Sequence, residues 1–241
     1  SLPPMDVADR SGRLRARLDG AGCDAVLVTN LTNIRYLTGF TGSSALLLVT
    51  ADDLLFVTDG RYRDQATRQL AEARVPARVE IGRTSEEQRD HLAKVVGGLS
   101  RLGLEAENVT WAQERRFATK WFEGTEMVAT DGLVEDLRRV KDAGEVARIK
   151  AACAMADAAL AAVRHRLGEG ATEAEVALEL EWQMRRLGAD GPSFDTIVAS
   201  GPNGAMPHHR AGERPIFEGD LVVIDFGALL DGYHSDMTRT V

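Results

Sequence analysis

Two aspartates near the end of the chain, Asp225 and Asp236, are spaced in a way that suggests a shared chemical role. Asp225 follows the apolar run 221–224, and a second strand-like run contains Asp236. Between them, Asp231-Gly232 is typical of a tight β-hairpin turn. The sequence therefore predicts two antiparallel strands that each carry an acid.

The centre of the turn decides which residues face each other. Residue numbers paired across an antiparallel hairpin have a constant sum, and side chains alternate between the two faces. If the turn is centred just before Asp231, Asp225 lies opposite Asp236. If it is centred just after Asp231, Asp236 lies opposite Gly227, one diagonal from Asp225. Both registers put the two carboxylates on the same face, roughly 5 to 8 Å apart.

Two carboxylates at that separation repel each other, unless a cation lies between them or they share a proton. Hard divalent cations prefer carboxylate oxygens, and two metal ions about 3.5–4 Å apart can be bridged by such acids. The alternative is one solvent-facing acid and one turn-associated acid, and we assign Asp231 to that class. Because Asp225 follows four apolar residues, we expect it to be buried and to have a partner. The spacing alone leaves both interpretations open.

The segment before the hairpin predicts two helices, a strand and a loop. Asp142 begins a helix whose apolar residues recur at helical spacing up to Leu167. The capping box Thr172–Glu175 opens a second helix. A strand at 194–200 follows, and then a loop that contains His208.

The first part of the chain alternates strands with helices, which is typical of an α/β domain. Strands are predicted at 24–30, 44–50, 54–59, 78–81, 103–109 and 126–130, and helices at 6–18, 33–37, 62–73 and 85–99, the last from a capping box at Ser85. A boundary near Gly132 separates a domain at 1–131 from a second domain at 132–241.

Composition excludes several classes of function. The 241 residues carry a net charge of −8, which argues against nucleic-acid binding as the main role. No apolar run reaches the length of a membrane span and no signal-peptide core is seen, so we expect a cytoplasmic protein without a membrane partner. The two cysteines, Cys23 and Cys153, predict reduced core thiols and no disulfide framework.

Three segments resemble one family. They are VVIDFGALLDGYHSDMTRT at 222–240, SGPNGAMPHHRAGERPI at 200–216 and NIRYLTGFTGSSALLLVTADDLLFVTDGRY at 33–62. Their sequences are similar to motifs of the Xaa-Pro dipeptidase (prolidase) and aminopeptidase P family. The resemblance implies an α/β creatinase-like N-terminal domain followed by an α+β pita-bread catalytic domain.

The resemblance also implies a set of site residues. Asp225 would be one metal ligand and Asp236 a bridging ligand of two divalent metal ions, Mn, Co or Zn, which activate a water. His208 would stabilise the tetrahedral intermediate, a role in which an imidazole donor lowers the barrier by a few kcal/mol. His209 is a weaker candidate for the same role.

Four further residues near this site have open roles. Ser235 and Thr238 flank Asp236 and are candidates for orienting its carboxylate, with ordinary strand hydroxyls as the alternative. Arg239 either pairs with an acid of the site or is exposed. Arg61 belongs to the N-terminal DGRY motif. We favour a role for Arg61 in the turn over a contact with a dimer partner or the substrate.

The sequence departs from the family at its end. A complete family site has two Asp, one His and two Glu as ligands, and no His or Glu follows Asp236. We therefore expect a C-terminally incomplete chain that holds the first half of the pita-bread domain and is inactive by itself.

The function that the resemblance implies is hydrolysis of the peptide bond before proline in proline-containing peptides, by a homodimer. Whether the activity is that of a dipeptidase or of an aminopeptidase P stays open. The alternatives are an inactive pita-bread peptide-binding module and a creatinase-like C–N hydrolase without metal. The presence of both Asp225 and Asp236 argues against these two.

Overall fold

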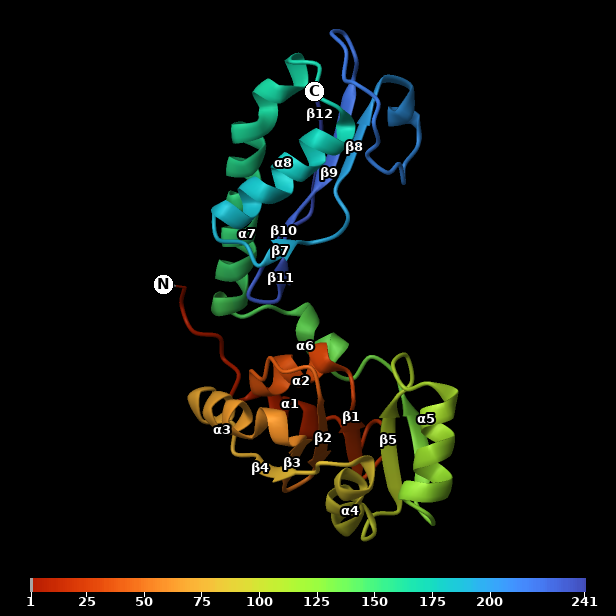
Figure 1. The fold of residues 1–241 in the computed structure, drawn as a ribbon. Coiled ribbons are helices and arrows are strands. Elements are labelled where there is room, and N and C mark those ends of the chain that lie inside the picture. The colour runs from red at the N-terminus through yellow and green to blue at the C-terminus, as the bar shows by residue number, and fades with distance from the viewer. Residues whose placement is uncertain (1) are drawn as a thin grey trace. The chain divides into compact units, whose positions relative to one another are not determined.

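A computed structural model describes residues 2–241, and Figure 1 shows the fold as a ribbon. The chain divides into two compact units, one made of residues 6–140 and the other of residues 141–241 together with residues 2–5. Each unit has its own hydrophobic core and is described by itself.

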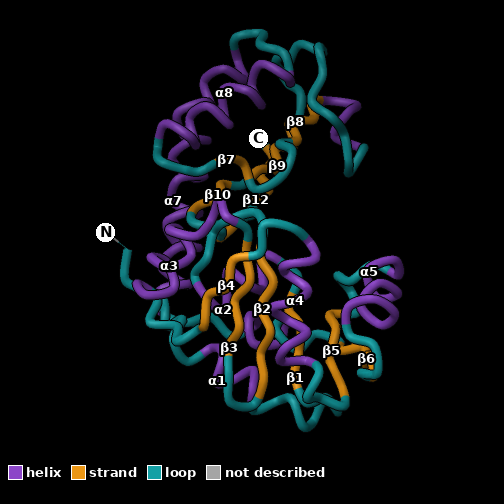
Figure 2. Tube along the Cα trace, turned by 60° about the horizontal axis from the view of Figure 1, so that its bottom comes forward, coloured by secondary structure: helices purple, strands orange, loops and turns teal. Residues whose placement is uncertain are grey.

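The first unit is built on a six-stranded mixed sheet in the order β4-β3-β2-β1-β5-β6. In Figure 2 these strands lie side by side, with β4 at one edge and β6 at the other. The central strands are antiparallel, whereas β4 pairs parallel with β3, and β5 and β6 continue parallel from β1. The strands are β1 (Ala25–Val28), β2 (Ala45–Thr50), β3 (Leu54–Thr58), β4 (Arg78–Ile81), β5 (Arg101–Glu105) and β6 (Glu126–Thr130).

The helices of this unit are α1 (Arg10–Arg15), α2 (Leu31–Thr38), α3 (Arg63–Glu72), α4 (Ser85–Val96), α5 (Trp111–Arg116), a π-helical turn (Phe117–Trp121) and α6 (Glu135–Arg139). Leu92 and Val96 of α4 pack with Leu27 and Leu48 of the sheet in one core cluster. Its strands and helices confirm the prediction of an α/β domain.

The structure corrects three local predictions in this unit. The N-cap of α4 is Thr84, whose side chain accepts from Glu87 N, rather than Ser85. The segment α5 with its π-helical turn and the short helix α6 were not predicted. The chain divides between Val140 and Lys141 rather than near residue 132, because α6 belongs to the first unit. There the Tyr36 hydroxyl donates to the carbonyl oxygen of Leu137 at 3.1 Å.

In the second unit two long helices cover two small sheets. The helices are α7 (Ala143–Val163), followed by a 3₁₀ turn (Arg164–Gly168), and α8 (Glu173–Arg186). One sheet has the order β11-β10-β7 and the other β12-β9-β8. The strands are β7 (Gly191–Pro192), β8 (Ile197–Ser200), β9 (Val222–Phe226), β10 (Ala228–Leu230), β11 (Tyr233–His234) and β12 (Met237–Thr240), with a 3₁₀ turn (Gly201–Ala205) after β8.

The core of this unit lies between the helices and one face of the strands. Figure 1 shows α7 and α8 on the same side of β9, and Ala156 of α7 and Leu180 of α8 pack with Ile224 and Phe226 in one cluster. The helix starts at Asp142 and Thr172 are confirmed as capping boxes.

The two cysteines differ from the prediction in part. Both are free thiols, but only Cys23 is buried, whereas Cys153 lies exposed on α7. Among residues 2–241, no helix combines the length and the apolar character needed to cross a membrane.

Candidate active site

The hairpin that carries both predicted acids adopts the second of the two predicted registers. Thr238 pairs with Asp225 in β9 and β12, and β10 and β11 keep the same register. The turn residues Asp231 and Gly232 have φ values of 50° and 77°, as a tight hairpin turn requires. This register places Asp236 opposite Gly227, one diagonal from Asp225, just beyond the paired residues of β12.

Gly227 sits where the hairpin passes from one small sheet to the other. A Cβ atom at this position would lie 1.9 Å from the carbonyl oxygen of Ser235. That oxygen accepts from the Ser193 hydroxyl at 2.7 Å, and Ser193 N donates to the Gly227 carbonyl at 2.8 Å. The close approach leaves room for glycine alone, and it fixes the strand that leads into Asp236.

Asp225 lies on the face of its sheet that points away from the helices. Its neighbours Ile224 and Phe226 are fully buried, whereas Asp225 itself is half-buried, less than its apolar context predicted. Asp236 is exposed. The hydroxyl of Thr238 donates to Asp225 Oδ1 at 2.7 Å, which orients that carboxylate.

The two flanking hydroxyls bond elsewhere than to the Asp236 carboxylate, and Ser235 matches the alternative of an ordinary strand hydroxyl. Thr238 bonds to Asp225 and not to Asp236. Ser235 is buried, and its hydroxyl oxygen accepts from Ala228 N at 2.8 Å, so it stabilises the hairpin. Arg239 is exposed and donates to the Thr238 carbonyl oxygen at 2.8 Å.

His208 is exposed and lines an open cavity of about 560 Å³ in the second unit. Apolar side chains of Ala177 on α8, Phe194 and Ile197 form part of the lining. Ile197 is the residue of β8 that pairs with Asp225. The register therefore puts one wall of the cavity on the strand beside the predicted ligand.

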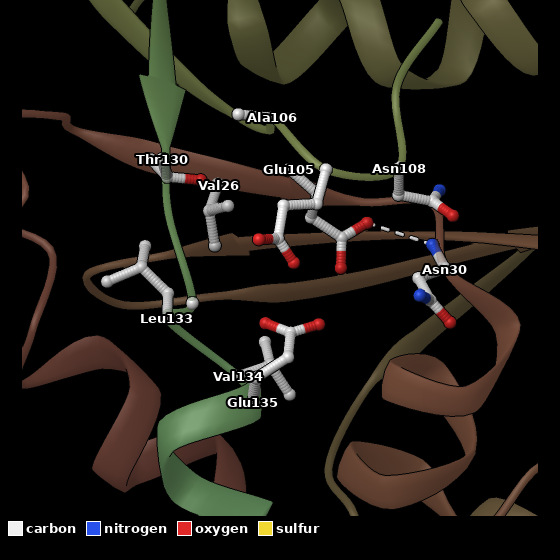
Figure 3. A pocket seen from close by; sticks show the side chains of 11 residues that line it. Val26, Asn30, Glu105, Ala106, Asn108, Thr130, Leu133, Val134 and Glu135 are labelled. Carbon is white, nitrogen blue, oxygen red and sulfur yellow. Dashed lines mark hydrogen bonds between the residues drawn. The ribbon is translucent and has the colours of Figure 1, made fainter.

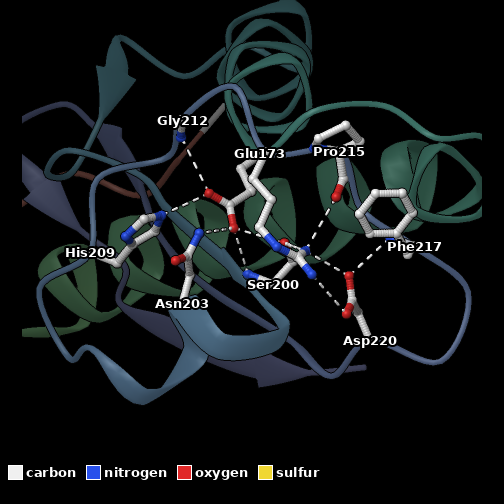
Figure 4. Close-up of polar contacts among 9 residues, drawn as sticks. Glu173, Ser200, Asn203, His209, Gly212, Pro215, Phe217 and Asp220 are labelled. Atoms are coloured by element: carbon white, nitrogen blue, oxygen red, sulfur yellow. Dashed lines mark hydrogen bonds and ion pairs between the residues drawn. The ribbon is translucent and has the colours of Figure 1, made fainter.

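A buried carboxylate that the sequence pattern did not reveal lies beside the loop that contains His208. Glu173, the first residue of α8, has no solvent exposure. Its carboxylate accepts from Ser200 N and Oγ at 2.7 Å, from Asn203 Nδ2 at 2.9 Å, and from Gly212 N at 3.3 Å. His209 Nε2 lies 2.7 Å from Glu173 Oε2. Figure 4 shows these groups converging on the carboxylate from the loop around it.

The pKa of Glu173 follows from this environment. Burial raises it, but hydrogen bonds from Asn203, Ser200 and His209 outweigh burial and lower the pKa from 4.5 to about 2. A carboxylate that only accepts hydrogen bonds keeps its charge when several donors surround it. Glu173 is therefore ionised throughout the neutral range.

Glu173 could have been found in the sequence from its position in the helix. It lies in register with Val176, Leu180 and Met184, which form the buried stripe of α8. An acid on the apolar stripe of a helix needs several partners. The sequence pattern at 172–175 indicates only a capping box, which Thr172 and Glu175 indeed form.

An ion pair closes the loop that contains His208. Arg214 donates to the two carboxylate oxygens of Asp220 at 2.7 and 3.1 Å and also to the Ser200 hydroxyl. The hydrogen bond from Arg214 lowers the pKa of Asp220. Gly201 has a φ of 52°, and a Cβ there would lie 2.6 Å from Asp220 Oδ1. Backbone geometry and charge thus hold both ends of the loop.

The first unit has a small cavity of about 130 Å³ at the carboxyl ends of β1, β5 and β6. Figure 3 shows Glu105 and Glu135 among its lining side chains. Glu105 accepts from Thr29 N at 2.6 Å and from Asn30 N at 2.8 Å, and Asn33 Nδ2 donates to both glutamates. These bonds tie the start of α2 to the sheet, and we assign them a structural role.

The two aspartates of the hairpin suit a divalent cation in the chemistry of their donors, because such cations prefer carboxylate oxygens. They are fewer than a complete site needs. Across the part of the chain that the structure describes, no three His, Cys, Asp or Glu side chains gather closely enough to hold a metal ion. Asp225 and Asp236 alone therefore do not make a complete metal site.

Comparison with known proteins identifies the family. Residues 147–241 match the model of metallopeptidase family M24, and residues 10–140 match the creatinase/prolidase N-terminal domain. The chain belongs to metallopeptidase family M24. Its fold is accordingly a creatinase-type N-terminal domain followed by a pita-bread domain, which confirms the predicted fold class and family.

Two relatives of this M24 chain have names that describe peptidases. It is 33% identical to the Xaa-Pro dipeptidase of Pyrococcus horikoshii over 93% of this chain and 61% of the relative. It is 38% identical to the uncharacterized peptidase YqhT of Bacillus subtilis over 95% of this chain and 64% of that protein.

Solved structures agree with these matches. The Xaa-Pro dipeptidase from Bacillus anthracis superposes with a TM-score of 0.90 at 39% identity, over 97% of this chain and 64% of that one. The X-Pro aminopeptidase from Thermotoga maritima gives a TM-score of 0.85 at 35% identity, over 97% and 64% of the two chains. This M24 chain thus spans a little under two thirds of the length of these relatives.

Proposed function

We propose that this chain contributes to a metal-dependent peptidase that hydrolyses the bond before proline. The observation that carries the proposal is the hairpin register, which sets Asp225 and Asp236 one diagonal apart. Ile197, which pairs with Asp225, lines the same cavity as His208. The names of the relatives, which include both Xaa-Pro dipeptidases and an X-Pro aminopeptidase, support the substrate class.

Within the proposal, Asp225 and Asp236 hold two divalent cations, Mn, Co or Zn, together with ligands from outside the described residues. Such cations lower the pKa of a bound water and polarise a carbonyl oxygen. Thr238 fixes the Asp225 carboxylate. His208 donates a hydrogen bond to the oxygen that becomes negative as the peptide carbonyl is attacked. The proposal also includes a homodimer, which sedimentation velocity tests. It includes a cytoplasmic location as well.

The proposal is tested with Ala-Pro as substrate, on the chain and on the protein as its gene encodes it, with Mn²⁺, Co²⁺ or Zn²⁺ and after chelation. We expect metal-dependent release of proline by the encoded protein. Asp236→Asn should reduce kcat at least about 100-fold, whereas Asp231→Asn in the hairpin turn should leave kcat within about twofold. Comparing Ala-Pro with Ala-Pro-Ala separates a dipeptidase from an aminopeptidase P.

Two results would contradict the proposal separately. Absence of Ala-Pro and Ala-Pro-Ala cleavage by the encoded protein with all three metals would refute the peptidase. Full activity of Asp236→Asn would refute the ligand assignment and leave the peptidase standing.

A further inference from the structure

The loop that carries His208 folds around one carboxylate. Ser200 N and Gly212 N, near the two ends of the loop, both donate to Glu173, at 2.7 and 3.3 Å. Asn203 donates from within the loop at 2.9 Å. His208 lies between these anchored points, and its neighbour His209 contacts the same carboxylate.

The two neighbouring imidazoles have different environments. The Nε2 atom of His209 lies 2.7 Å from Glu173 Oε2, and the side chain is 14% exposed. Because an ionised carboxylate only accepts hydrogen bonds, this nitrogen of His209 carries the proton. His208 is exposed and lines the cavity. Anchoring one ring therefore restrains the backbone that carries the other.

A carboxylate suits this position better than an amide. The surrounding groups are donors toward Glu173, and the two oxygens of a carboxylate offer about four lone-pair sites for them. A glutamine would turn an NH₂ group toward donors such as Gly212 N. Because the position has no solvent exposure, water cannot replace the lost partners.

We propose that Glu173 is the positioning residue for His208 in the reaction. It is not a catalytic residue, because it is absent from the lining of the cavity and acts through the loop. The inference rests on the proposed function, since it assumes that His208 contacts the reacting carbonyl. A purely structural role for Glu173 is the competing interpretation, and it predicts a general loss of stability without a specific effect on His208.

The first test measures order in the loop and needs no activity. In Glu173→Gln we expect amide hydrogen exchange in residues 200–212 to accelerate at least about tenfold, with strands 222–240 unchanged. Glu175→Gln is the matched control, because it removes a charge in the same helical turn from an exposed side chain. Equal exchange in Glu173→Gln and wild type would overturn the proposal.

The second test asks whether Glu173 acts through His208. We expect Glu173→Gln to lower kcat on Ala-Pro about 10- to 100-fold, with KM and Mn²⁺ affinity within about twofold. Glu173→Asp should recover part of the loss. In a His208→Gln background, Glu173→Gln should lower kcat by less than about twofold, because the imidazole that Glu173 positions has been removed. Independent, multiplying losses in the double variant would overturn the proposal.

Two outcomes need separate controls. If Glu173→Gln does not fold, His209→Leu removes one donor while leaving the carboxylate, and a smaller loss of kcat in the same direction is expected. A fully active His209→Leu with unchanged loop exchange would then overturn the proposal. If the wild-type protein cleaves neither Ala-Pro nor Ala-Pro-Ala, the proposed function fails. The exchange test still decides whether Glu173 orders the loop, and unchanged exchange overturns that as well.

Discussion

Replacing Gly227 by alanine should unfold the second unit far more readily than any exposed glycine substitution. The added Cβ would lie 1.9 Å from the Ser235 carbonyl oxygen. Carbon–oxygen contacts in proteins begin near about 3.3 Å, so the two strands have to separate by roughly 1 Å or more. The atom that blocks the methyl group is backbone and cannot rotate away.

The cost follows from the hydrogen bonds at this point. Separation of the strands stretches three bonds: Ser193 Oγ to Ser235 O at 2.7 Å, Ser235 N to Ala228 O at 2.9 Å, and Ala228 N to Ser235 Oγ at 2.8 Å. Each contributes about 1 kcal/mol, and overpacking adds about 1–3 kcal/mol. We expect a loss of about 4–6 kcal/mol in the free energy of unfolding. For a unit of this size that corresponds to a fall in Tm on the order of 20 °C.

Trp182 reports on this unit, because it is the one tryptophan after Lys141. Incorporated 5-fluorotryptophan gives each of the three tryptophans its own ¹⁹F signal, and Trp182→Phe assigns the relevant one. Urea titration then follows the second unit, while the signals of Trp111 and Trp121 follow the first. We expect the Trp182 midpoint alone to move in Gly227→Ala.

Gly168→Ala is the matched control, because nothing lies within 4 Å of a Cβ placed there. It should change the free energy of unfolding by less than about 1 kcal/mol. A Gly227→Ala protein with the midpoint of the wild type and of this control would show that the strands do not approach as described. The placement of Asp236 would then lose its basis.

Two further predictions follow from the site. The pKa of Glu173 lies below its ordinary value, so its stabilisation is complete above about pH 4.5 and is lost as the pH falls towards about 2. This contribution is about 3 kcal/mol, and urea titrations at pH 5 and pH 2.5 should show the gap between wild type and Glu173→Gln narrowing. A gap independent of pH would contradict the assignment. Thr238→Val should weaken Mn²⁺ binding about tenfold, because the Asp225 carboxylate loses its hydrogen-bond donor. Water-proton relaxation measures this affinity. Thr240→Val, also exposed on β12, should not weaken it, and equal effects would argue against a specific role for Thr238.

The hairpin could be predicted from sequence because its determinants are local. The Asp231-Gly232 turn and the alternation of side chains limited the register to two, and both placed Asp225 and Asp236 on one face. The choice between them depended on which two residues form the turn, and Asp231 and Gly232 take the positive φ values of a tight hairpin turn. The close contact of Gly227 with Ser235 is not revealed by alternation. The capping boxes at Asp142 and Thr172 are likewise local, and they marked the starts of both long helices.

The parts that sequence did not predict depend on distant contacts. The hydrogen bonds to Glu173 come from residues 27 to 39 positions away, so no local pattern shows that the carboxylate is surrounded by donors. The sequence makes Thr238 only a candidate for orienting its neighbour Asp236, whereas in the sheet register its hydroxyl donates to Asp225. The π-helical turn at 117–121 is defined by hydrogen bonds between residues five apart, such as Phe122 N to Phe117 O at 2.9 Å, which the 3.6-residue period of an α-helix does not predict.

The different loop lengths around the site bear on the order in which its parts assemble. The strands of Asp225 and Asp236 are joined by a two-residue turn, and hairpins of this kind form in about 1–10 μs. The contact between Glu173 and Gly212 has to close a separation of 39 residues, and longer closures cost more chain entropy. The two acids should therefore meet before the His208 loop is in place. During that interval they repel each other without the rest of the site, and divalent cations present during refolding should weaken that repulsion.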